Sequence, residues 1–119
     1  MLSTPAELNQ FMRAYVRGAF TDRATRRQQF QFVPGGSGPP GPGTNSAGLA
    51  LFRYATSCGT VYGHTGNFPG YTIFAAATAN GSRSVTVIIN EQLNENPVTP
   101  AFTQLQTVWG LGVCAALHS

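Results

Sequence analysis

The sequence predicts an α+β fold, in which an antiparallel β meander is flanked by an N-terminal and a C-terminal helix. Three observations predict it. Apolar residues recur at helical spacing near both ends of the chain. The middle holds short strand-like runs, and the last two, in residues 71–90, surround Asn80-Gly81, the strongest short signal of a β-hairpin. With 119 residues, the chain is long enough for one domain with its own core.

The first segment, residues 1–32, is expected to be helical. Thr4 is suited to cap a helix, Pro5 suits the first helical position, and Glu7 completes a capping box. The residues that follow give the helix one apolar face: Leu8, Phe11, Met12, Tyr15 and Val16. Gly18 is expected to end this helix.

A short second helix is expected within residues 21–32, with three arginines turned outward: Arg23, Arg26 and Arg27. Most of the basic residues lie between Arg13 and Arg27, and the chain contains no lysine. This cluster overlaps an amphipathic helix and lacks the aromatic side chains that stack on bases. A solvated helix face is therefore favoured over a patch that binds nucleic acid.

Residues 33–47 are rich in glycine and proline and include the run PGGSGPPGPG at 34–43. This run is expected to form neither a helix nor a paired strand, and so to be a flexible loop or an insertion. Antiparallel strands are expected in residues 48–90, as four segments: 49–55, 60–64, 71–79 and 84–90.

The chain is expected to close with a helix in residues 97–117. It would start at Pro97 or Pro100 and have one buried side: Phe102, Leu105, Val108, Trp109 and Val113. No apolar run in the sequence is long enough to cross a bilayer. The first ten residues have neither the basic nor the apolar region of a secretory signal.

The two cysteines, Cys58 and Cys114, lie too far apart for a CxxC redox or zinc spacing. They suggest a disulfide and hence an oxidising compartment, and two buried free thiols are the alternative. His64 and His118 have no supporting cluster of cysteines or carboxylates, so no metal site is expected. A nucleophilic pair of Cys58 and His64 lacks a third residue to orient the histidine.

The run VYGHTGNFPGY, residues 61–71, places a His-Thr step between two glycines and ahead of a Pro-Gly pair. Glycine inside a strand often marks a place where something approaches the backbone closely. Together with the hairpin, YGHTGNFPGYTIFAAATANGSRSVTVIIN resembles the third active-site motif of the serine β-lactamase and penicillin-binding superfamily. It is most similar to the class C-like branch, which includes D-Ala-D-Ala carboxypeptidases and esterases. There the usual Lys-Thr-Gly is often His-Thr-Gly, matching His64, Thr65 and Gly66.

The resemblance covers most of the chain and implies the C-terminal portion of a β-lactamase-like fold. The motif strand would form one wall of an acylation cleft, with Thr65 donating its hydroxyl to a substrate carboxylate and His64 adding positive or hydrogen-bonding character. Gly66 would let the substrate lie against the strand as an added edge. The N–H of Asn67 would be one of two oxyanion-hole donors. The resemblance also implies a disulfide between the two cysteines and no cofactor.

The superfamily's nucleophile is the serine of a Ser-x-x-Lys motif. That motif is impossible in a chain without lysine, so we expect a single partial domain over residues 1–119, a C-terminal fragment that is inactive alone. The parent would be secreted or in the cell envelope and would act on a peptidoglycan stem peptide, a β-lactam or a small ester. Arg53 lies near the position of a carboxylate-binding arginine in relatives, and its role is left open.

The alternative is a non-catalytic interaction domain that uses an exposed sheet edge or an apolar face. A fragment that exposes apolar surface is also expected to self-associate. The two functions differ in one structural feature. Enzyme ancestry predicts an open edge beside the His-Thr-Gly strand, whereas a dedicated binding domain predicts an edge already covered.

Overall fold

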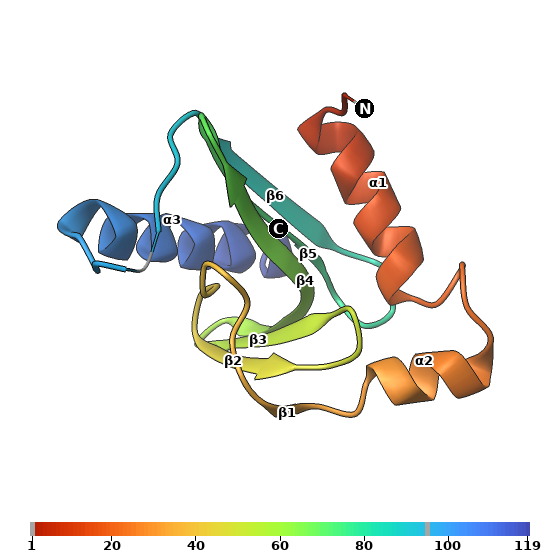
Figure 1. Ribbon diagram of the computed structural model, residues 1–119. Helices are drawn as coiled ribbons and strands as arrows, with labels where there is room; N and C mark the ends of the chain where they lie inside the picture. Colours follow the sequence, from red (N-terminus) through yellow and green to blue (C-terminus); the bar gives the residue numbers. More distant parts are fainter. Residues whose placement is uncertain (1, 95) are drawn as a thin grey trace.

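The structure is a computed structural model that describes residues 2–94 and 96–119. In these residues it contains one six-stranded antiparallel sheet with the strands in chain order. The helices α1 (Pro5–Val16) and α3 (Pro100–Leu117) lie on opposite sides of the sheet (Figure 1). The predicted fold class is confirmed. The remaining elements are α2 (Arg23–Gln29), β1 (Val33–Pro34), β2 (Thr44–Ala47), β3 (Phe52–Thr56), β4 (Gly59–Phe68), β5 (Tyr71–Ala77) and β6 (Ser84–Ile89).

Helix α1 begins at the predicted capping box. The Glu7 N–H donates to Thr4 Oγ1 at 3.2 Å, and the Thr4 N–H donates to Glu7 Oε2 at 2.8 Å. Gly18 follows the last turn with a φ of +91°, a conformation that glycine adopts without strain. The predicted apolar face is only partly buried, because Phe11 is 50% exposed.

In α2 the prediction that all three arginines point outward is wrong for Arg26. Its Nε donates to the Val16 carbonyl at 3.2 Å and its Nη2 to the Ala79 carbonyl at 2.9 Å. A carbonyl in the last turn of a helix lacks an intrahelical donor, so a neighbouring guanidinium satisfies it. Arg23 and Arg27 are exposed, as predicted.

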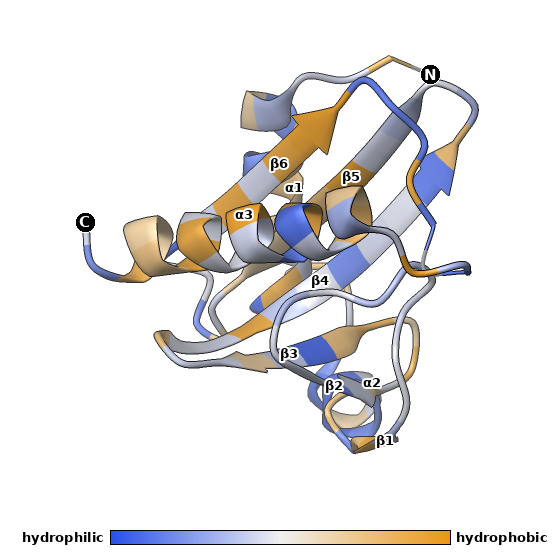
Figure 2. Ribbon diagram, turned by 90° about the vertical axis from the view of Figure 1, so that its left-hand side faces the viewer, coloured by the Kyte–Doolittle hydropathy of each residue, from blue (hydrophilic) through white to orange (hydrophobic). Residues whose placement is uncertain are grey.

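The core has two layers, one on each face of the sheet. Alternate residues of β5 supply them, because successive side chains of a strand point to opposite faces. The layer under α3 contains Tyr54, Val61, Phe74, Ala76, Val85, Leu105, Trp109 and Val113. The layer under α1 contains Met12, Val16, Leu51, Ala75 and Ala77. Figure 2 shows α3 lying across its face of the sheet.

The predicted buried side of α3 needs one correction. Phe102, Leu105, Trp109 and Val113 are buried, whereas Val108 is 47% exposed. The buried residues recur every three or four positions and face the sheet. Val108 falls beside that stripe, so its side chain lies at the flank of the helix. The helix begins at Pro100, one of the two predicted starts.

The prediction that residues 33–47 form a loop without a paired strand is wrong. Val33 and Pro34 pair with Ala47 and Ser46, so this segment adds two strands to the predicted four. Proline is tolerated here because β1 is an edge strand, where a missing N–H breaks no ladder. The segment between β1 and β2 is also packed against the rest of the protein, because Ser37 is only 4% exposed.

The predicted hairpin in residues 71–90 is confirmed, although its strands end earlier, at Ala77, and resume at Ser84. Gly81 provides the positive φ in the turn, +71°. The strand expected at 60–64 continues to Phe68, so the His-Thr-Gly motif lies inside β4. The strand expected at 49–55 begins only at Phe52, because residues 48–51 form a turn.

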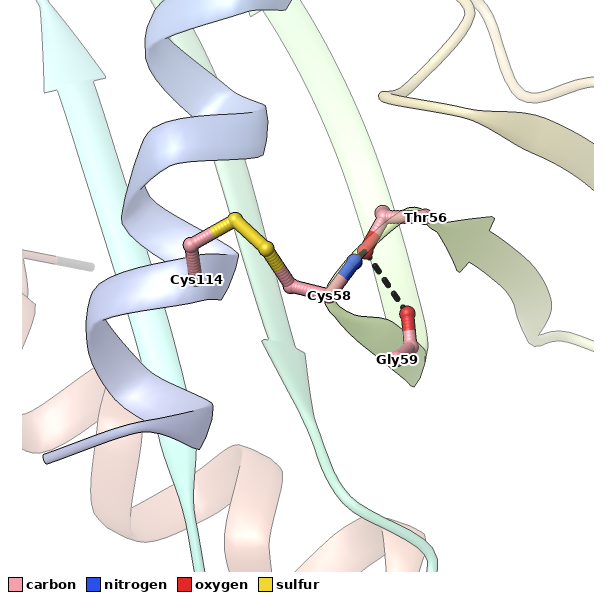
Figure 3. The surroundings of a disulfide bond; sticks show 4 residues. All are labelled: Thr56, Cys58, Gly59 and Cys114. Carbon is pink, nitrogen blue, oxygen red and sulfur yellow. Dashed lines mark hydrogen bonds between the residues drawn. A yellow bond between two sulfur atoms is a disulfide. The ribbon is translucent and has the colours of Figure 1, made fainter.

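The two cysteines are bonded, and the alternative of two free thiols is wrong. Cys58 lies in the tight turn between β3 and β4, and Cys114 lies in α3, with their Cα atoms 5.2 Å apart (Figure 3). Thr56 braces the turn by donating to the Gly59 carbonyl at 2.7 Å. The disulfide therefore ties α3 to the start of the motif strand. Within the described residues, no helix is long and apolar enough to span a membrane.

Candidate functional site

Strand β4 carries the His-Thr-Gly motif and has a free edge along its second half. β3 pairs with β4 only as far as Phe52 opposite Gly63. β5 pairs with β4 from Tyr62 to Phe68. Within residues 2–94 and 96–119, the stretch 64–68 therefore has a strand neighbour on the β5 side and none on the other side. We call this stretch the open edge.

The two tight hairpins of β4 decide which backbone groups face the open edge. The residues that flank a two-residue turn exchange both backbone hydrogen bonds, and the direction then alternates along the strand. Gly59 flanks the turn to β3, so the odd-numbered residues of β4 point their N–H and C=O groups toward β3. Phe68 flanks the turn to β5, so the even-numbered residues point theirs toward β5. Thr65 and Asn67 therefore present their N–H and C=O groups to the open edge.

Asn67 is held in place by its side chain. Its Nδ2 donates to the Leu93 carbonyl at 3.1 Å and also contacts Asn94 Oδ1. These contacts join the end of β4 to the segment that follows β6. The Asn67 N–H, the donor that the resemblance assigns to an oxyanion hole, therefore lies on a fixed strand and points to the open edge.

His64 is exposed, and its side chain contacts a backbone group of the open edge. Its ring meets the Phe52 ring edge to face, with 5.0 Å between the centroids. Its Nδ1 lies against the Thr65 carbonyl oxygen. A carbonyl only accepts hydrogen bonds, so we assign the proton to Nδ1. His64 Nε2 is then the nitrogen available to a ligand.

Thr65 is not placed as the resemblance implies. Its side chain is 3% exposed and lies in the α3 layer, where its hydroxyl donates to the Pro39 carbonyl. The expectation of a hydroxyl that faces a substrate carboxylate is therefore not met. Val61, four residues earlier on the same strand, points into the same layer. Because side chains alternate between the two faces of a strand, the Thr65 side chain points there as well.

Pro39 belongs to a short segment, residues 37–41, that we call the strap. The Tyr54 hydroxyl donates to Ser37 Oγ at 2.9 Å, and the Ser37 hydroxyl donates to the Pro39 carbonyl at 2.9 Å. Burial raises the pKa of Tyr54 to about 12, so the phenol remains a neutral donor. The glycine and proline content suggested a flexible loop, and no feature of the sequence revealed this network in advance.

Gly66 lines a pocket between β4 and α1. The pocket has a volume of about 570 Å³ and is mainly apolar, lined by Leu2, Leu8, Gly66, Phe68, Tyr71 and Ile88 among others. A Cβ on Gly66 would meet only Ile73 Cγ2, at 3.6 Å, an ordinary contact. The fold therefore does not require glycine at this position, and its absent side chain keeps the strand surface open.

Arg53 is engaged away from the open edge. Its Nη2 donates to Ser46 Oγ at 3.2 Å, and its Cζ lies 5.1 Å from the centre of the Phe32 ring. Among residues 2–94 and 96–119, no group of three or more His, Cys, Asp or Glu side chains could hold a metal ion. The open edge and its surroundings offer backbone donors, one imidazole and an apolar pocket.

No protein-family model matches the chain. Among solved structures, the chain is similar to a D-stereospecific amidohydrolase from Streptomyces sp., with 26% sequence identity and a TM-score of 0.63. The match covers 73% of this chain and 25% of the amidohydrolase, so the chain corresponds to about a quarter of that enzyme's length. The α+β sheet with its two flanking helices is consistent with a fragment of the β-lactamase-like fold.

Proposed function

We propose that the chain forms one wall of the acylation cleft of a serine hydrolase of the β-lactamase and D-alanyl-D-alanine carboxypeptidase type. The open edge of β4 beside His64 and Gly66 carries this proposal. The similarity to an amidohydrolase supports it, because that enzyme also acts on a carbonyl carbon. The attacking serine and its lysine would come from protein outside these residues, since the chain contains no lysine.

An extended substrate would add to the sheet as a further strand, opposite the backbone groups of Thr65 and Asn67. Recognition of this kind takes its affinity from main-chain hydrogen bonds. The Asn67 N–H would donate to the oxygen that gains negative charge during acylation. His64 Nε2 would contact the end of the substrate that carries this oxygen. The classes that suit this geometry are stem peptides, β-lactams and small esters, together with amides.

The disulfide suits an extracytoplasmic location of the parent protein. By itself the chain is expected to be catalytically silent, because the acyl-forming serine is missing. Incubation with a fluorescent penicillin tests this. Covalent labelling of the purified chain would show that a nucleophile lies within these residues.

The proposed binding mode can be tested on the chain as it is. ¹⁵N chemical shifts would be followed during titration with N-acetyl-D-alanyl-D-alaninamide, a neutral extended probe. We expect the largest shifts at the Thr65 and Asn67 amides, because these face the open edge, and smaller shifts at the Tyr62 amide, which is bonded to β5. Asn67→Pro deletes the edge N–H and should weaken binding strongly, while Asn67→Ala keeps the N–H, loses only the side-chain contacts with Leu93 and Asn94, and should weaken binding much less. Shifts that cluster away from β4 would refute this mode.

The alternative, a dedicated interaction domain, makes a different prediction for this edge. Such a domain should already cover the edge beside the motif, whereas in the described part of the chain residues 64–68 have no strand neighbour there. This observation favours the cleft strand. The outer edge of β6 is also unpaired within the described sheet, so strand addition by a partner remains the competing function for that edge.

A further inference from the structure

We propose that Thr65 is a positioning residue: its hydroxyl fixes the strap to β4 and so sets the wall of the cleft, instead of binding a substrate carboxylate. This rests on the proposed function only in treating the open edge as part of a cleft. The fixing of the strap itself depends on contacts within the chain.

Three hydroxyl groups form a hydrogen-bond network that ends on one carbonyl of the strap. Tyr54 donates to Ser37, and Ser37 and Thr65 both donate to the Pro39 carbonyl. A carbonyl oxygen has two lone pairs, so Pro39 is fully satisfied. Tyr54 is completely buried, and Ser37 and Thr65 are 4% and 3% exposed. Loss of one donor would therefore leave a buried acceptor short of a partner.

The rest of the strap is held from other directions. The Gly41 N–H donates to Asn45 Oδ1 at 2.8 Å, and Asn45 Nδ2 donates back to the Gly41 carbonyl at 3.1 Å. Gln106 of α3 donates to the Pro40 carbonyl at 3.3 Å. A Cβ on Gly41 would lie 2.3 Å from Tyr54 Cε1, so the strap packs directly on the tyrosine ring. Thr65 is the residue through which β4 joins this network.

The position of the Thr65 proton has a consequence for the substrate. A hydroxyl has one proton, and that proton is given to Pro39. The side chain is also only 3% exposed, so Thr65 has neither a free proton nor an accessible oxygen for a substrate carboxylate. A change at Thr65 should therefore affect the binding of the amide and the carboxylate forms of one peptide alike.

The strap is tested first without any ligand, by amide hydrogen exchange in four proteins. Thr65→Val deletes the donor at nearly constant shape, and Thr65→Ser restores it. Thr60→Val is the matched control, an exposed threonine on the same strand. We expect exchange of the Gly41 amide to become about tenfold faster in Thr65→Val and to stay within about twofold of the parent in the other two. Unchanged Gly41 exchange in Thr65→Val would overturn the proposal.

If Thr65→Val does not fold, Ser37→Ala interrupts the same network from the strap side, and the same acceleration is expected. The substrate consequence is tested with two probes of nearly equal shape, N-acetyl-D-alanyl-D-alaninamide and N-acetyl-D-alanyl-D-alanine. Thr65→Val should weaken the binding of both probes by a similar factor, because the residue acts through the strap. A loss confined to the carboxylate probe would restore Thr65 as a carboxylate ligand. If neither probe binds, the proposed function fails, whereas the exchange data still decide the role of Thr65.

Discussion

At the scale of single residues, the two glycines of the motif strand have different reasons to be glycine. A Cβ on Gly63 would lie 2.0 Å from the Ala75 carbonyl oxygen and 2.6 Å from Ala76 Cα, so β5 leaves no room for one. A Cβ on Gly66 would meet nothing closer than 3.6 Å. Gly63 is therefore required by packing between strands, while Gly66 is required only by something outside the fold, such as a ligand.

This difference gives a matched pair of variants. Gly63→Ala should lower the free energy of unfolding by about 2 kcal/mol or more, because β4 and β5 must separate to admit the methyl group. Gly66→Ala should leave it unchanged or raise it by about 0.5–1 kcal/mol, because glycine is unfavourable inside a strand. Urea unfolding of both variants decides the matter. Equal destabilisation would show that Gly66 also serves packing.

The residue scale is also where the sequence was least informative. The His-Thr-Gly motif and its strand could be predicted from the sequence, but the partner of the Thr65 hydroxyl depends on the strap. That strap is formed by residues whose order reflects tertiary contacts with Tyr54 and Asn45. Local composition predicts conformational freedom for a Gly/Pro-rich run and contains no information on such contacts.

At the scale of elements, the helix starts and the hairpin could be predicted because their signals are local. A capping box, Asn-Gly in a turn and apolar periodicity each involve residues close in sequence. β1 and β2 could not be predicted, because their pairing forms across the run at 34–43, whose prolines argue against a strand. Proline is compatible with β1 only because it lies at the sheet edge, which is a property of the topology.

The carboxylates at the starts of α1 and α2 should make the free energy of unfolding depend on pH in the acid range. The hydrogen bond from the Thr4 N–H holds the pKa of Glu7 below its ordinary value, and the Thr25 N–H does the same for Asp22. A carboxylate whose pKa is lowered by folding stabilises the folded state at pH values above the pKa that the group has in the unfolded chain. This stabilisation is lost as the pH falls through the pKa of the folded state.

We therefore expect the urea midpoint to decrease as pH falls from about 5 to about 3, with part of the decrease due to these two caps. The double variant Glu7→Gln, Asp22→Asn keeps hydrogen-bonding caps without the charge and should show a shallower decrease. An identical slope for parent and double variant would mean that neither cap contributes.

At the scale of the whole molecule, the disulfide joins the turn before β4 to the last helix and so closes β4, β5 and β6 into one loop. Such a bond restricts the unfolded chain, and the loop-entropy model gives about 4 kcal/mol for this length. The double variant Cys58→Ala, Cys114→Ala should lose stability of about that size. Ser57→Ala, in the same turn, is the control and should change little.

The state of the cysteines is checked independently by intact mass after alkylation without reductant. The native protein should take up no alkyl group. Two alkylated thiols would contradict the disulfide and remove the reason for the predicted loss of stability.

The molecule as a whole exposes several large apolar side chains around the pocket between β4 and α1, with Phe68 61% and Tyr71 48% exposed. A surface of this kind is usual where another part of a protein packs or a ligand binds. It agrees with a cleft wall that is completed by further protein, and it is also the surface through which self-association of the isolated chain is expected.

The central claim is that this chain can serve as the cleft wall of an acyl-transfer enzyme, with the Asn67 N–H as an oxyanion donor. The most direct measurement is made in a chimera, in which the matching part of this chain replaces the corresponding quarter of the Streptomyces amidohydrolase. Its hydrolysis of a D-configured amide would be compared in two variants of equal thermal stability. We predict that Asn67→Ala retains activity within a few fold, while Asn67→Pro, which lacks the N–H, loses about a hundred- to a thousandfold in kcat. Equal activity of the two folded variants would contradict the claim.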